Sequence, residues 1–391
     1  MPHNLRHLRV FLAVVDTGSV TRAADACHVS QPAVTQALNK IERTAGVSLF
    51  TRTPHGMFVN KTGERLATRV RRAFNYLDPA LTELAPRLRI TATTAQLQAL
   101  IAVREAENFT LAARRMGIAQ PTVHRAVTQL EQEAARPLFE RTSYGTIATR
   151  AAQNLAQAAR LAFAELAQAE ADLAEDISAE AGRIVIGAMP LSRSYVLPKA
   201  IARFRRFRPN LPIHVLEGPY SDLLGGLRRG EIDFLIGALR NPPPIDDVEQ
   251  RLLFNDTVVI VAGNGHPLAD KTKIEPEDLL SYPWVVAHVG TPIRLHFEAL
   301  FEKMGRPVPS SLVESGSLIL MRELLDASDH LGCISYRQAE AEIARGLMTA
   351  LPFDLSHTSR PIGLTLRANW MPTLAQQQFL DLLSMPKDGG E

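Results

Sequence analysis

Hydrogen-bonding side chains recur at helical spacing in the segment Ser30-Gln-Pro-Ala-Val-Thr-Gln-Ala-Leu. On a helix starting at Ser30, its small and apolar residues fall on the inner side, namely Ala33, Val34, Ala37, Leu38 and Ile41. The outward side then carries Gln31, Thr35, Gln36, Asn39 and Lys40. Amide and hydroxyl groups of this kind bond base edges in the major groove, where glutamine can pair with adenine through two bonds. The alternative interpretation is an ordinary solvated helix face.

The segments around this helix predict a compact support for it. Apolar residues at helical spacing between Leu8 and Val15 indicate a first amphipathic helix, and Thr21 to Cys27 a short second one. Ser30 can cap the third helix, and Pro32 is tolerated in a first turn. The stretch LFTRTPHGMFVNKT then predicts two short strands around a turn. Three helices and a hairpin make a winged helix-turn-helix.

The same pattern occurs a second time. A shift of 89 residues places the segment that starts at Leu8 on the segment that starts at Leu97. Identical pairs include Ala23 with Ala112, Gln31 with Gln120, Pro32 with Pro121, Glu42 with Glu131, Leu49 with Leu138 and Arg52 with Arg141. Most identities are small or apolar residues at helical spacing, so a packed domain has been duplicated; two copies at this period are not a solenoid.

A long helix is predicted after each copy. Leu66, Val70, Ala73, Leu77 and Leu84 mark one apolar seam, and the other comprises Leu155, Ala159, Ala162, Leu166, Ala169 and Leu173. Spacing of this kind favours a coiled coil, so we expect at least one of these helices to pair with its counterpart in another subunit. Pro79 and Pro86 are predicted to interrupt the first helix, which makes the second the better dimerisation helix.

Composition and charge narrow the class of protein. The chain has 391 residues, which is long enough for several domains. Its composition, 46% hydrophobic and 21% charged, is typical of globular proteins. Lys and Arg number 13 in residues 1–90 against 6 Asp and Glu, whereas the rest of the chain is slightly acidic. A basic block of this kind suits contact with a polyanion. The amino-terminal apolar patch has helical spacing and no cleavage site, so it predicts a folded helix rather than an export signal.

From Gly182 onward, β-branched runs alternate with helical stretches. RIVIGA, IHVLEG, IDFLIGA, TVVIVAG and LGCIS predict strands, and together they indicate a mostly parallel sheet covered by helices on both faces. The pattern restarts after His266-Pro267, so we expect two α/β lobes with a cleft between them. Ligands of open α/β sheets bind at the carboxyl ends of strands, which here would face that cleft.

Both halves of the chain resemble one family. GSVTRAADACHVSQPAVTQALNKIERTAGVSLFTRT resembles the DNA-binding domain of LysR-type transcriptional regulators, and GRIVIGAMPLSRSYVLPKAIARFRRFRPNLPI with GEIDFLIG resembles their effector-binding domain. The resemblance implies a two-lobed fold like that of type 2 periplasmic binding proteins. It also implies homodimers or homotetramers, double-stranded operator DNA and a small-molecule effector. The second winged helix departs from the usual single copy.

The resemblance assigns DNA contacts within the first copy. Base contacts fall on Gln31, Pro32 and Thr35, with Gln36 beside them, and a phosphate contact falls on Arg52 at the base of the wing. Arg22 and Lys61 are either further phosphate partners or ordinary surface charges.

The second copy keeps only part of these features. Ala119 replaces the capping serine, whereas Arg141 is kept, and His124 and Arg125 could still face a groove. Either the second copy also contacts DNA, or it is kept for packing or spacing.

Four loops carry the expected effector site. The residues that the resemblance assigns to it are Met189, Leu191, Ser192, Pro219, Tyr220, Val289, Thr291 and Ser317. Helix starts with free N–H groups and hydroxyls suit a carboxylate or another polar ligand. Many relatives have Ser or Thr where this chain has Leu191 and Pro219, which argues against a simple carboxylate anchor. Each residue has the alternative of merely shaping its loop.

Enzyme signatures are absent from the sequence. It contains no HExxH, GxSxG or GxxxxGK[ST] motif and no Cys/His cluster with metal spacing, so we expect no cofactor and no metal. Cys27 and Cys333 are the only cysteines and lie in different predicted domains, which fits a reducing cytoplasm and excludes a redox pair within the effector domain. His266 is expected to shape a turn.

These observations combine into one interpretation. The expected domains are a DNA-binding winged helix over 1–62, a linker helix over 63–90, a second winged helix over 91–150, a linker or dimerisation helix over 151–178 and an effector-binding domain over 181–385. Function would be cytoplasmic transcriptional regulation, with an effector bound between the lobes. Two rival interpretations remain: a ligand-binding protein whose winged helices contact only other proteins, and a solute receptor for transport.

Overall fold

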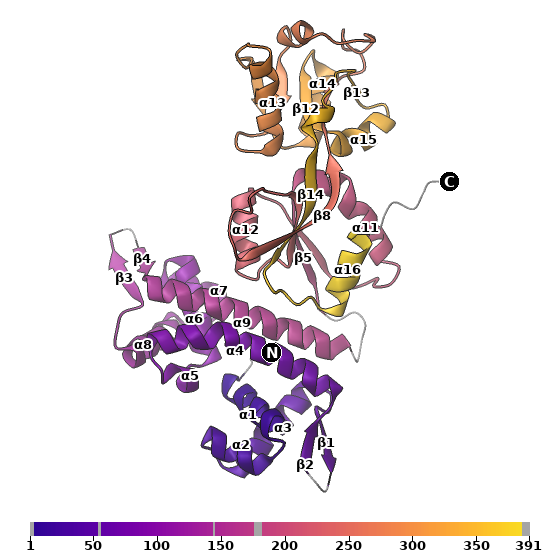
Figure 1. Cartoon of the computed structure of the whole chain (residues 1–391). Coiled ribbons are helices and arrows are strands. Elements are labelled where there is room, and N and C mark those ends of the chain that lie inside the picture. Colours follow the sequence, from indigo (N-terminus) through magenta and orange to yellow (C-terminus); the bar gives the residue numbers. More distant parts are fainter. Residues whose placement is uncertain (1–3, 54–55, 144, 176–181, 385–391) are drawn as a thin grey trace. The chain divides into compact units, whose positions relative to one another are not determined.

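The computed structural model describes residues 4–53, 56–143, 145–175 and 182–384, without the side chains of Arg52 and Arg141. The chain forms two compact units, which divide between Arg183 and Ile184. Figure 1 shows the helices and hairpins of the first unit and the two sheets of the second.

The first winged helix has the predicted element order. Its elements are α1 (Leu5–Thr17), α2 (Val20–Cys27), α3 (Gln31–Ala45), β1 (Phe50–Thr53) and β2 (Gly56–Val59). Asn4, Ser19 and Ser30 cap the three helices through side-chain oxygens that accept backbone N–H groups. Phe11, which is fully buried, packs edge-on against Phe50 with ring centroids 5.6 Å apart and so joins α1 to the wing.

The second copy repeats this arrangement. Its elements are α6 (Thr94–Ala106), α7 (Phe109–Met116), α8 (Gln120–Ala134), β3 (Phe139–Thr142) and β4 (Gly145–Ala148). One identical pair has the same function in both copies. The carboxylate of Glu42 accepts the N–H of Leu49 at 2.8 Å, and that of Glu131 accepts the N–H of Leu138 at 2.8 Å. Each glutamate therefore ties its third helix to the start of its wing.

Long helices follow both wings, with a short helix after the first. They are α4 (Lys61–Leu84), α5 (Leu88–Thr91) and α9 (Arg150–Glu175). The predicted interruption at Pro79 is wrong, because α4 continues through this residue to Leu84. The buried side chains of Leu77 and Leu81 flank the proline, so packing compensates for the backbone hydrogen bond that proline cannot donate. The helix ends before Pro86.

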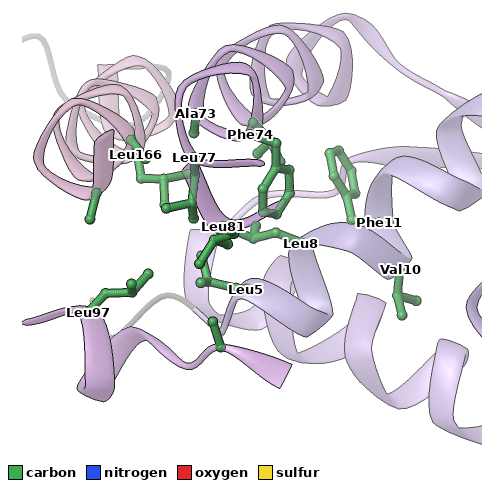
Figure 2. Packing of buried hydrophobic residues seen from close by; sticks show 14 of the residues in the cluster. Leu5, Leu8, Val10, Phe11, Ala73, Phe74, Leu77, Leu81, Leu97 and Leu166 are labelled. Atoms are coloured by element: carbon green, nitrogen blue, oxygen red, sulfur yellow. The ribbon is translucent and has the colours of Figure 1, made fainter. Parts of the chain in front are cut away.

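The seam residues of the two long helices are buried within a single chain. Helix α4 packs against α9 of the same chain. Leu77 on α4 and Leu166 on α9 are at most 1% exposed and belong to one apolar cluster. Figure 2 shows Leu166 beside Ala73 and Leu77. The spacing predicted a seam correctly, and within one chain each long helix covers the seam of the other. Sequence spacing does not distinguish a helix of the same chain from one of another chain, so pairing with another subunit stays a prediction.

A buried ionic cluster accompanies this seam. The guanidinium of Arg69 on α4 is 1% exposed and lies 3.2 Å from a carboxylate oxygen of Glu165 and 2.8 Å from one of Asp172, both on α9. It also donates to the amide oxygen of Gln168 at 2.9 Å. Arg72 donates to the other oxygen of Glu165 at 2.9 Å. Burial raises the pKa of Asp172, and the positive charge of Arg69 opposes that shift.

The second unit contains two five-stranded sheets. The first has the strand order β6-β5-β7-β14-β8, and the second β11-β10-β12-β9-β13. The strands are β5 (Ile184–Ala188), β6 (Ile213–Leu216), β7 (Phe234–Ala238), β8 (Val248–Asp256), β9 (Val258–Ala262), β10 (Trp284–Val286), β11 (Leu312–Glu314), β12 (Leu331–Ser335), β13 (Thr349–Ala350) and β14 (Arg360–Arg367).

Helices cover both faces of each sheet, as predicted. They are α10 (Pro190–Ser194), α11 (Val196–Phe204), α12 (Tyr220–Arg228), α13 (Pro292–Lys303), α14 (Leu318–Ala327), α15 (Tyr336–Ala344) and α16 (Leu374–Ser384), with short 3-10 turns at Pro276–Leu280 and Ser356–Thr358. In β5, Ile184 and Ile186 join one apolar cluster, whereas Val185 between them joins another on the opposite face.

The prediction of a mostly parallel sheet is wrong in one respect, because both sheets are mixed. Strand β5 pairs in parallel with β6 and β7, but β14 is antiparallel to β7 and β8. Strand β12 is likewise parallel to β10 and antiparallel to β9. The antiparallel strands arise where the chain crosses between the lobes, once from β8 to β9 and once from β13 to β14 (Figure 1).

Candidate nucleic-acid interface

The outward side of α3 forms an open groove lined by polar and basic residues. Val20 of α2 lines it together with Gln31, Pro32, Thr35, Gln36, Asn39, Lys40 and Arg43 of α3. The seven α3 residues are exposed. Five of them, Gln31, Thr35, Gln36, Asn39 and Lys40, were predicted to face outward, and Pro32 was assigned to the site by resemblance. The seventh, Arg43, lies one turn beyond the predicted face.

Packing fixes which side of α3 faces outward. Val34 is fully buried and Ala37 and Leu38 are 3% or less exposed, so these residues attach α3 to the rest of the winged helix. Ala33 is exposed, contrary to its predicted place on the inner side. It follows Pro32 in the first turn of α3, so helical spacing alone overestimated the width of the buried stripe.

The cap of α3 provides a testable difference between the copies. The Ser30 hydroxyl accepts the N–H of Ala33 at 3.4 Å, whereas Ala119 gives α8 no side-chain cap. We expect Ser30→Ala to lower the unfolding free energy by about 1 kcal/mol and Ala119→Ser to raise it by a similar amount. Urea unfolding followed by circular dichroism measures both changes. Ser143→Ala, at an exposed position, is the control, and equal effects of Ser30→Ala and this control would contradict the cap.

The other basic residues singled out in the sequence lie on neighbouring elements of the first winged helix. Arg22 on α2 is exposed, and its guanidinium donates to the carbonyl oxygen of Thr17. Lys61 is exposed at the first position of α4. Arg52 lies in β1 opposite Met57, at the base of the wing, but its side chain is outside the described part of the molecule.

The second copy presents a related but different face. Gln120, Pro121, His124 and Arg125 of α8 are exposed at the positions that match Gln31, Pro32, Thr35 and Gln36. The ring of His124 lies 5.3 Å from that of Phe109 on α7, and Nδ1 of His124 lies 3.3 Å from the Thr128 hydroxyl. The two copies therefore share the glutamine and proline that start the face and differ at the two outward positions of the next turn.

The predicted effector residues fall at the starts of four helices in the second unit. Met189 precedes α10, Pro219 precedes α12, Thr291 precedes α13 and Ser317 precedes α14. The strands before them are β5 and β6 in one sheet and β10 and β11 in the other, and each pair is parallel. Each lobe therefore brings two of these loops to the same edge of its sheet.

These residues differ in how accessible they are. Leu191 is 4% exposed and Ser192 is fully buried, and the Ser192 hydroxyl donates to the carbonyl oxygen of Met189 at 2.7 Å. Val289 is 68% exposed. The hydroxyls of Thr291 and Ser317 accept N–H groups of their own helices, from Arg294 at 3.3 Å and Leu320 at 3.2 Å. Arg240 lies 4.8 Å above the ring of Tyr220, a contact that the sequence pattern did not indicate.

The structure shows the surroundings of three titratable side chains that were singled out in the sequence. Nδ1 of His266 accepts the N–H of Leu268 at 3.0 Å, which confirms its predicted role in the turn. Cys333 in β12 is buried, and burial raises the pKa of its thiol to about 12. Cys27 is partly exposed, and partial burial raises its thiol pKa as well. A raised pKa makes both thiols weak nucleophiles.

The described part of the chain lacks two other kinds of feature. No group of three or more His, Cys, Asp or Glu residues there could hold a metal ion. None of the helices described has both the length and the apolar character that crossing a lipid bilayer requires.

Winged helices with an exposed polar and basic α3, together with a two-lobed α/β unit, define a DNA-binding protein with a ligand-binding domain. Residues 5–64 and 94–172 match the model of the bacterial regulatory helix-turn-helix proteins of the lysR family. Residues 178–385 match that of the LysR substrate binding domain. The chain therefore belongs to the LysR family, and it is a DNA-binding transcriptional regulator with an effector-binding domain.

Individual relatives agree with this family. The HTH-type transcriptional regulator GalR of Pseudomonas putida is 34% identical over 375 residues, covering 95% of this chain and 94% of its own. The HTH-type transcriptional regulator CbbR of Xanthobacter flavus is 29% identical and covers 74% of this chain and 84% of its own. A full-length OxyR variant from Pseudomonas aeruginosa has a similar fold, with a TM-score of 0.53 at 23% identity, covering 74% of this chain and 92% of that one.

Proposed function

We propose that α3 of the first winged helix reads the operator in the major groove. In this proposal Gln31, Pro32, Thr35 and Gln36 contact base edges, and Arg52 contacts a phosphate at the base of the wing. The observation that supports it is the open groove on α3, whose exposed lining combines amide and hydroxyl groups with Lys40 and Arg43. Such groups can discriminate bases while the cations neutralise phosphates.

The effector is proposed to bind between the two lobes of the second unit. Its site would comprise Met189, Leu191, Ser192, Pro219, Tyr220, Val289, Thr291 and Ser317. The gathering of these loops at the carboxyl ends of parallel strand pairs supports the proposal. A ligand that binds one lobe arrangement more tightly shifts the protein towards it in proportion to that difference in affinity. The protein acts in the cytoplasm, as a homodimer or homotetramer, without catalysing a reaction.

Mobility-shift titration of the operator tests the DNA-reading part of the proposal. We expect Gln31→Ala and Thr35→Ala each to weaken operator binding about 5- to 150-fold, the range for losing one specific base contact. Loss of a phosphate contact in Arg52→Ala should instead weaken all sequences and lower the salt dependence by about one unit of slope. Thr44→Ala is the matched control, because Thr44 is exposed on the same helix but does not line the groove. Unchanged binding by all three variants would refute the proposal.

A further inference from the structure

The pairing of α4 with α9 joins two equivalent elements of the duplicated region. The 89-residue shift that relates the two winged helices also places Leu66 on Leu155, Leu77 on Leu166 and Leu84 on Leu173. Each of these six leucines is buried, and all belong to one apolar cluster. Arg69, near the start of α4, contacts Asp172, near the end of α9, so the helices run antiparallel. The equivalent helices of the two copies thus cover each other's seams within one chain.

The buried charges make this pairing specific for unlike helices. The cations Arg69 and Arg72 of the ionic cluster lie on α4, whereas Glu165 and Asp172 lie on α9. Under the same 89-residue shift, α9 has Ala158 and Leu161 in place of the two arginines. Two α9 helices paired in this way would bury carboxylates without cations, which is strongly unfavourable. The cluster therefore favours α4 with α9 over two copies of α9.

The second copy retains an exposed face that is suited to DNA. Gln120, His124 and Arg125 are exposed on α8, and Arg114 and Arg115 are exposed at the end of α7. Three nearby carboxylates have partners within the fold. Glu131 accepts the N–H of Leu138, Glu133 accepts the Thr91 hydroxyl, and Glu105 pairs with Arg160 of α9. Arg114, Arg115 and Arg125 give α8 and the end of α7 three exposed cations, which phosphate binding requires.

The side chains on this face differ from those of the first copy in a way that changes base preference. Thr35 is matched by His124, and Gln36 by Arg125. Glutamine pairs best with adenine, whereas arginine pairs best with guanine through its O6 and N7 atoms. A face built on α8 would therefore select a different base sequence from one built on α3.

We infer that one chain carries two unlike DNA-reading surfaces, on α3 and α8, which the α4 and α9 pairing holds as an internal pair. The operator then contains two different boxes, and each chain reads both. The inference rests on the proposed function, because it assumes that the α3 surface reads DNA. It adds a second binding surface and predicts an asymmetric target.

Selection from random double-stranded DNA with the full chain tests this inference. We expect the wild-type protein to enrich sites with two unlike boxes. The double variant Gln31→Ala/Thr35→Ala should lose protection of one box in footprinting, and His124→Ala/Arg125→Ala should lose protection of the other, each with about tenfold or more weaker binding. Gln120→Ala gives a second, milder change on α8. Thr44→Ala is the control, and matching thermal midpoints of all variants show that they are folded.

Mixing the two double variants shows whether one chain reads both boxes. If each chain reads both, an equimolar mixture binds no better than the stronger variant alone. Restored wild-type binding in the mixture would mean that separate chains read the boxes, and it would overturn the internal pair. A selected site in which only the α3 variants alter binding would overturn the α8 surface while leaving the proposed function intact. No enrichment by the wild-type chain would instead refute the proposed function itself.

Discussion

Replacing Arg69 with methionine should lower the unfolding free energy of the first unit by about 3 to 5 kcal/mol, the cost of removing one partner of a buried ion pair. Arg69 is 1% exposed, and Glu165 beside it is 6% exposed. Methionine fills most of the volume, but it removes the 2.8 Å ion pair of Asp172 and leaves Glu165 with Arg72 only among the ion pairs described. Urea unfolding of the full chain, followed by circular dichroism, measures the loss.

The matched control is Arg71→Met on the same helix. Arg71 also forms an ion pair, with Asp16 at 2.5 Å, but both side chains are about half exposed, at 47% and 58%. Exposed pairs contribute about 0 to 1 kcal/mol, so this variant should remain close to wild type. If the two variants lost equal unfolding free energy, burial of the ionic cluster between α4 and α9 would not determine how much it contributes to stability.

Replacing Asp256 with asparagine should destabilise the second unit by a similar amount, about 3 to 5 kcal/mol. Asp256 ends β8, and its fully buried carboxylate lies 3.2 Å from the guanidinium of Arg360, which begins β14 and is 9% exposed. The other carboxylate oxygen accepts the N–H of Arg337 at the start of α15. Burial lowers the pKa of Arg360, and the charge of Asp256 opposes this shift. Asparagine preserves the shape but removes that charge.

The control for Asp256→Asn is Asp247→Asn. Asp247 pairs with Arg228 at 2.7 Å, with both side chains about half exposed. Its loss should cost less than about 1 kcal/mol. Strands β8 and β14 lie next to the two crossings between the lobes, and the effector is proposed to bind between those lobes. Once an effector is identified, we therefore expect it to raise the thermal midpoint of Asp256→Asn less than that of the wild type. A stability equal to that of Asp247→Asn would contradict the prediction.

Local patterns in the sequence predicted the elements that carry the candidate site. Helical spacing and the Ser30 cap located α3, and the alternation of strands and helices located β5, β6, β7, β9 and β12. These patterns involve residues that are close together in the chain, so they predict helices and strands without knowledge of the tertiary structure. The duplication was equally visible, because packed positions such as Leu49 and Leu138 stay apolar in both copies.

Long-range pairing could not be predicted in the same way. The seam of α9 has the same spacing whether it meets α4 or another chain, and only the structure shows Arg69 against Glu165. Strands β8 and β14 were not predicted as strands, because their places in the sheet depend on where the chain crosses between the lobes. Pro79 argued against a continuous helix, but tertiary packing of Leu77 and Leu81 outweighed that local preference.

The candidate site was predicted in part. Side-chain type and spacing predicted that Gln31, Thr35 and Gln36 face outward, and they line the groove on α3, whereas Arg43 was recognised only from the shape of that groove. In the second unit, sequence placed Leu191 and Ser192 in a loop, whereas the structure buries both. Burial of a short helix depends on residues distant in the chain, which no local pattern shows.

The contact of α4 with α9 inside one chain also affects how the target sequence can evolve. When two identical chains share a symmetric target, one mutation alters both half-sites at once. If α3 and α8 both read DNA, as inferred above, the two reading helices are encoded separately, so a change at Thr35 leaves His124 as it was. A promoter and its regulator can therefore diverge one half at a time, with the unchanged half preserving recognition meanwhile.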